Sequence, residues 1–354
     1  MLSIVYLMLF LSGGAVIARL LLPRLKPVLR VYLGLSLGVL LLMWLPVLWA
    51  YAVRFSHAAH WLALGTLALL VGAAWLWRDR RAPAPFDEAE KRTLRLMLVL
   101  VVPLTVLGGY LQYTHSIRLA ADGTYHVGQS TYGDLSLHLA VCTSIVNASF
   151  PLENSLMLGA TMAYPYLSDS IATSMLMLGM PLNTAMAFTG TMMMALVYAG
   201  YGLLAMQLCR RRGAAALAFF LLFLNGGLGF FYVLDGVWQD ATLFRSVFTG
   251  YYDAPANMIE NNIRWVNVIC DMMIPQRTLL AGWTMVIPAL YLLALAMRDR
   301  ALSGSPWLPV VISTTFSGGY LFSCSMSIST PSGACRYPSS RAICVLLAML
   351  RPDT

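Results

Sequence analysis

The feature that most constrains this chain is a series of long apolar stretches separated by short polar segments. Eight of them approach the roughly 20 residues that a helix needs to cross the hydrocarbon core of a bilayer. Hydrophobic residues make up 59% of the chain and charged residues 11%, which is far from the balance of a soluble domain. The sequence therefore predicts an all-α, polytopic transmembrane bundle of about eight spans. They cover 1–22, 31–53, 58–77, 96–113, 183–208, 214–233, 279–297 and 306–325.

The basic residues gather in alternate loops, which predicts the orientation of the bundle. Short loops rich in Lys and Arg stay in the cytoplasm, and all four basic clusters fall on one face if 114–182 contains no complete crossing. We therefore expect the N-terminus and two long polar loops, 114–182 and 234–278, on the outer face. The net charge of +8 then has a topological origin, so no nucleic-acid partner is predicted. The clusters are Arg19, Arg24, Lys26 and Arg30; Arg78, Arg80, Arg81, Lys91, Arg92 and Arg95; Arg210, Arg211 and Arg212; and Arg298 and Arg300.

The chain divides into three parts by its polar content. Residues 1–95 form a three-span bundle with few internal polar groups, and 96–300 form a membrane core that carries most of the unusual polar residues. Residues 301–354 hold the final span and an atypical tail, in which Ser, Thr, Gly and Cys crowd together from about residue 313. We expect the chain to be truncated or altered there, which leaves its activity open. The six cysteines are scattered without metal-like spacing, so no metal site is predicted.

The first outer loop contains the most informative motif. Asp134 follows Gly133 and opens an amphipathic stretch over about 135–149 that is expected to form a helix at the membrane surface. His138 lies four residues later, on the same side of that helix. A second short helix is expected over about 166–181. Asp134 has two interpretations, since Asp is also a favoured N-cap residue.

The order of these features resembles a known family. Gly-Asp134, an amphipathic helix, Phe150-Pro151, Tyr164-Pro-Tyr-Leu167 and a second short helix occur in that order. This arrangement resembles the C-type (GT-C) membrane glycosyltransferases that use dolichyl- or polyprenyl-phosphate sugars, such as protein mannosyltransferases and aminoarabinose transferases. The position before the Pro-Leu motif, where the family often has a lysine, holds Tyr164.

The resemblance implies a location and a set of partners. We expect a multi-pass protein of a bacterial inner or plasma membrane, with its active site facing outward. Its partners would be a polyprenyl-phosphate-linked sugar and membrane lipids. No cofactor is implied, and a requirement for a divalent cation is left open.

The predicted chemistry assigns roles to five residues. A carboxylate that takes the proton of an acceptor hydroxyl supplies general-base catalysis, and Asp134 is the candidate, in an inverting transfer. Arg277 stands before the seventh span, where a guanidinium could bind the donor phosphate or anchor a lipid headgroup. His138, Tyr164 and Asp169 are predicted to line the substrate site.

Two other classes of function stay open. A transporter would carry ionisable residues within its spans and discontinuous helices in corresponding positions of two halves. A non-catalytic membrane subunit of envelope polysaccharide assembly would need neither. The concentration of polar residues in the outer loops favours the enzyme.

Overall fold

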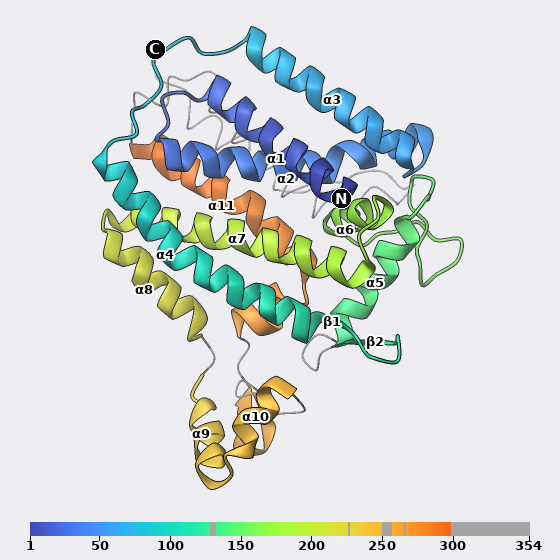
Figure 1. Ribbon diagram of the computed structural model, residues 1–354, viewed down its shortest axis with the longest axis vertical. Coiled ribbons are helices and arrows are strands. Elements are labelled where there is room, and N and C mark those ends of the chain that lie inside the picture. Colours follow the sequence, from blue (N-terminus) through green and yellow to red (C-terminus); the bar gives the residue numbers. More distant parts are fainter. Residues whose placement is uncertain (128–131, 226, 250–256, 265–266, 299–354) are drawn as a thin grey trace, which may run out of the picture.

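The computed structural model describes residues 1–127, 132–225, 227–249, 257–264 and 267–298. Six of the described helices are long and apolar enough to cross a membrane, which is the architecture of a multi-pass helical membrane protein. They run roughly alongside one another in Figure 1. The six are α1 (Leu2–Leu21), α2 (Pro27–Val53), α3 (His57–Leu76), α4 (Glu88–Leu111), α7 (Leu182–Cys209) and α11 (Arg277–Arg298).

Two packing arrangements hold this bundle together. Helices α1 and α2 pack very closely because Gly14 lies against the backbone of Gly34 and Gly38, where a side chain would not fit. Helix α7 packs against both α4 and α11, between which it runs in Figure 1. The N-terminal ends of α7 and α11 lie close to the segment that connects α4 to α7, because both helices contact α6.

That connecting segment contains no helix of spanning length among its described residues, as the charge pattern predicted. Helix α4 continues into a short π-helix, Gln112–Ser116, and the chain then forms a hairpin of β1 (Ile117–Leu119) and β2 (Tyr125–Val127). Two short helices follow, α5 (Tyr132–Ile145) and α6 (Leu167–Met177). They correspond to the predicted helices over 135–149 and 166–181, with somewhat different bounds.

The predicted all-α class agrees with the structure, since the described residues are mostly helical and their strands form only two small hairpins. In β1 and β2, Ile117 pairs with Val127 around a turn at which Asp122 accepts hydrogen bonds from the amide and hydroxyl of Thr124. A second small hairpin joins β3 (Asn257–Met258) to β4 (Ile263–Arg264). Both hairpins lie in the two long loops, where local turn chemistry decides the backbone.

The predicted sixth span, 214–233, is not a single helix. Helix α8 (Arg212–Phe223) has only 12 residues, and α9 (Phe230–Gln239) and α10 (Thr242–Thr249) follow as separate short helices. The helix ends where glycines cluster, with Gly227 at a φ of 68°. The carbonyl of Asn225 accepts a hydrogen bond of 3.1 Å from Asn267 Nδ2. The predicted eighth span, 306–325, and the tail lie outside the described residues.

Candidate functional site

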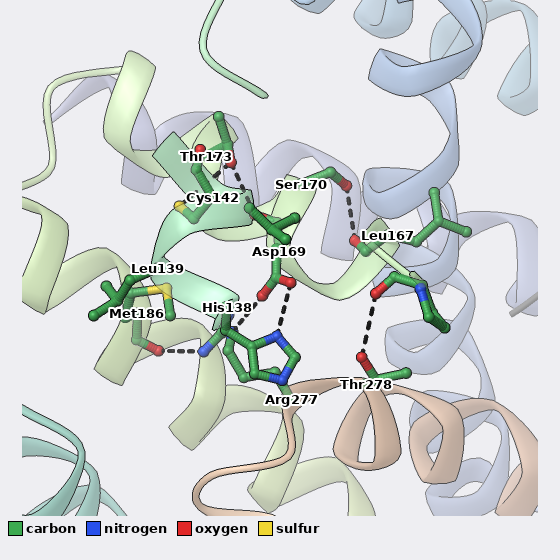
Figure 2. A network of polar contacts seen from close by, with 12 residues as sticks. His138, Leu139, Cys142, Leu167, Asp169, Ser170, Thr173, Met186, Arg277 and Thr278 are labelled. Carbon is green, nitrogen blue, oxygen red and sulfur yellow. Dashed lines mark hydrogen bonds and ion pairs between the residues drawn. The ribbon is translucent and has the colours of Figure 1, made fainter. Parts of the chain in front are cut away.

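A buried carboxylate on α6 connects three helices. Asp169 has no exposed surface, and its two oxygens accept different donors. Oδ1 lies 3.1 Å from Arg277 Nε at the start of α11, and Oδ2 lies 2.8 Å from His138 Nδ1 on α5. Figure 2 shows this arrangement. Asp169, expected in the substrate site, is therefore the centre of an ion network inside the protein.

All three guanidinium nitrogen atoms of Arg277 donate hydrogen bonds within the protein. Besides Asp169, it donates from Nη1 to the carbonyl oxygen of Met186 at 2.8 Å and from Nη2 to Thr189 Oγ1 at 2.7 Å. Both partners lie on α7, and the arginine is 1% exposed. The fork-shaped donor set explains why an arginine can join two helices here. In this arrangement the Arg277 side chain is enclosed by protein and not exposed at the surface.

His138 is held in one orientation by Asp169. A carboxylate paired with a guanidinium only accepts hydrogen bonds, so the proton of a neutral imidazole must lie on Nδ1. The other ring nitrogen, Nε2, has no hydrogen-bond partner among the described residues although it is buried. The ring of Tyr164 packs edge-on against His138, with 5.7 Å between the ring centroids.

Further contacts hold α5 against α6. Thr173 Oγ1 donates to the Cys142 carbonyl at 2.9 Å, and it also contacts the Asp169 carbonyl at 3.0 Å. Leu135 and Cys142 on α5 pack against Ala172 on α6 in a small apolar cluster. Polar contacts and apolar packing together place the first turns of α5 at a defined position beside the N-terminal end of α11.

Asp134 lies at the exposed end of this assembly. Helix α5 begins at Tyr132, so Asp134 lies within its first turn and not at the N-cap position considered from the sequence. A carboxylate in a first turn is stabilised by the positive end of the helix dipole. Its Oδ2 accepts a hydrogen bond of 3.3 Å from Gln276 Nε2, and the side chain is otherwise open to the surroundings.

Tyr164 is half-buried beside the same carboxylates. Burial raises the pKa of its hydroxyl, a hydrogen bond with Thr278 opposes this rise, and the charges of Asp169 and Asp134 add to it. Tyr164 therefore remains a neutral hydroxyl donor at neutral pH. Thr278 also donates to the carbonyl of Pro165 at 3.3 Å, which joins α11 to the loop of the Pro-Leu motif.

The structure thus brings all five sequence-predicted site residues to one region, although their roles stay predictions. Asp134 is exposed, Tyr164 is intermediate, and His138, Asp169 and Arg277 are buried. Sequence reasoning missed the contacts that complete the region, which come from Gln276, Thr189 and the Met186 carbonyl. Gln276 could have been found as the neighbour of Arg277, whereas Thr189 lies inside an apolar span and carries no sequence signal.

Comparison with protein-family models, curated proteins and solved structures finds no match for this chain. The resemblance to C-type glycosyltransferases therefore stands on the motifs quoted above.

Proposed function

We propose that this protein is a membrane glycosyltransferase that moves a sugar from a polyprenyl-phosphate-linked donor to an acceptor hydroxyl on the outer face of a bacterial inner or plasma membrane. Its base is Asp134. The proposal rests on one observation above all: an exposed carboxylate sits one helical turn from a histidine that is locked into a buried ion network.

The buried network holds the helix that carries Asp134 in place, which a general base requires. Proton transfer in the transition state is efficient only when the base is held in place relative to the reacting atoms. His138, through Asp169 and Arg277, fixes α5 to α6, α7 and α11. Because four residues of a helix rise by about 6 Å, the position of Asp134 follows from that of His138.

The proposed transfer forms one bond to the anomeric carbon and breaks another. The carboxylate of Asp134 takes the proton of the acceptor hydroxyl while that oxygen forms a bond to the anomeric carbon. The bond from this carbon to the donor phosphate oxygen breaks, and the lipid phosphate leaves with the electron pair. Attack opposite the leaving group inverts the anomeric centre. Tyr164 and Gln276, as neutral donors beside Asp134, would orient the substrates.

Arg277 is assigned a positioning role in this proposal. Its guanidinium group contacts Asp169, Met186 and Thr189 and is 1% exposed, so a donor phosphate would reach it only after the surrounding side chains moved. Direct phosphate binding by Arg277 stays a prediction. Substitutions of Arg277 can separate phosphate binding from a positioning role.

The direct test is turnover by the purified protein with labelled polyprenyl-phosphate sugars. Asp134→Asn should lower turnover by about a hundredfold or more, since positioned bases contribute roughly that much. The melting temperature should stay unchanged, because the side chain is exposed. Asp122→Asn, with the same charge change in the β1–β2 turn, is the matched control and should keep full activity. Full turnover by Asp134→Asn would remove Asp134 from the mechanism.

A transporter is the second candidate, although the network residues lie on the short helices α5 and α6 and at the first residue of α11 and not within a span. Ionisable side chains enclosed between helices are a common feature of transport proteins, and α8 ends well short of a span. Flux of a polyprenyl-phosphate sugar across proteoliposomes, without formation of a glycosylated product, would support this candidate over the enzyme.

A further inference from the structure

A second polar site lies at the opposite end of the bundle. A cavity of about 220 Å³ opens where the N-terminal ends of α2, α4 and α8 meet the C-terminal end of α7. Along α7, Met186 beside Arg277 and Arg210 at this cavity are separated by about 36 Å of helix. The charged residues that line the cavity, together with one amide, are Lys26, Glu90, Gln207, Arg210, Arg211 and Arg212.

The lining carries an excess of positive charge. Four of the lining residues are basic, and Glu90 is the only acidic residue in the lining. Glu90 is already engaged, because its carboxylate accepts the amide of Val28 at 3.0 Å and lies 4.0 Å from Lys26 Nζ. No carboxylate in the lining is therefore left to neutralise the three arginines.

The backbone concentrates this charge. Helix α7 ends at Cys209, and the next residue, Arg210, takes the left-handed conformation with a φ of 56°, which glycine usually adopts at the end of a helix. Helix α8 begins two residues later, so three consecutive arginines surround one tight turn. The partial positive charges at the N-terminal ends of α2, α4 and α8 outnumber the partial negative charge at the C-terminal end of α7.

We propose that this cavity binds a phosphoryl anion, supplied by either a lipid headgroup or a soluble phosphate compound. Guanidinium groups match the geometry of phosphate oxygens, and several can share one phosphate. The space is sufficient, since one water needs only about 10–15 Å³ on the same measure. The proposal is independent of the glycosyltransferase proposal, because the two sites share no residue.

The test uses the full chain in an uncharged detergent, with inorganic pyrophosphate as the soluble probe in calorimetry. In a second arm, native mass spectrometry compares retention of phosphatidylglycerol with retention of phosphatidylcholine. Replacing Arg210 and Arg211 together by Gln should weaken binding about tenfold or more. The matched control replaces Arg80 and Arg81, which lie outside the cavity lining, and should change binding by less than about twofold.

For Glu90→Gln we expect stronger anion binding, in contrast to the arginine variants. Gln keeps an acceptor for the Val28 amide but removes the negative charge, so anion binding should become several-fold tighter at low salt. Pyrophosphate binding would assign a soluble ligand, and selective retention of phosphatidylglycerol alone would assign a headgroup; either supports the proposal. Absence of binding in both arms, or equal losses in the two double variants, would overturn it.

Discussion

Asp169 and Arg277 form an ion pair that is enclosed by protein on all sides. This burial determines how substitution of either residue should affect stability. Both charges are hydrogen-bonded to further groups, which offsets the cost of removing them from water. A variant that removes one partner leaves the other charge buried and uncompensated. The main effect of changing either residue should therefore be on stability and on the geometry of α5, with catalysis affected through that geometry.

Arg277→Ala should reduce the free energy of unfolding by about 3–5 kcal/mol. Arg277→Lys should recover part of this loss, because Lys keeps the charge but cannot reach Asp169, Met186 and Thr189 together. Thermal unfolding in detergent measures both variants, with Arg118→Ala on the exposed strand β1 as the control. If the wild-type melting temperature persisted in Arg277→Ala while the donor Michaelis constant rose, direct phosphate binding would replace the positioning role.

At the scale of elements, the interrupted sixth hydrophobic stretch is the main finding. Hydrophobicity alone continues from α8 through 224–229, but the glycines there remove the preference for helix. Asn267 then stabilises the break from the second long loop. Its Oδ1 caps the helical turn Val268–Met273 through the amides of Ile269 and Cys270, while its Nδ2 donates to Asn225.

The two functions of Asn267 can be separated by substitution. Asn267→Ser keeps a capping oxygen but cannot reach Asn225, and should cost about 1 kcal/mol for the lost hydrogen bond. Asn267→Ala removes the cap as well and should cost about 2 kcal/mol in total. Melting temperatures should therefore fall in the order wild type, Ser, Ala. Equal melting temperatures for the wild type and both variants would show that the break does not depend on Asn267.

At the scale of the whole molecule, the helices place the candidate site and the basic cavity at opposite ends of one bundle. The arrangement agrees with the alternation of basic clusters along the chain. The first long loop joins α4 and α7 without a described helix of spanning length, so both helices have their loop ends on one side. If the basic end is cytoplasmic, the candidate site faces outward.

Cysteine labelling in intact cells checks this orientation. In a background with the six native cysteines replaced by Ser, Asp122→Cys in the β1–β2 turn should react with a membrane-impermeant maleimide. Ala82→Cys, in the basic loop between α3 and α4, should react only after the membrane is permeabilised. The reverse pattern would place the candidate site in the cytoplasm and contradict transfer on the outer face.

The sequence by itself determined the class of the molecule and the position of most of its long apolar helices. Length and apolarity indicate spans because unpaired backbone groups cannot lie in hydrocarbon, and this argument needs no neighbouring helix. It located the six helices of spanning length and the two short helices of the first long loop. It was wrong for 214–233, where propensity and a long-range contact from Asn267 prevail over hydrophobicity.

Only the tertiary structure decided what the polar residues contact. Asp169 resembles an ordinary loop acid in the sequence, and Arg277 an interfacial cation, because local sequence carries no record of partners 108 positions apart. Their burial follows from the packing of α6 against α7 and α11, which removes both groups from water and forces them to pair. Asp134 stays exposed for the same reason: the packing that encloses His138 ends one helical turn before it.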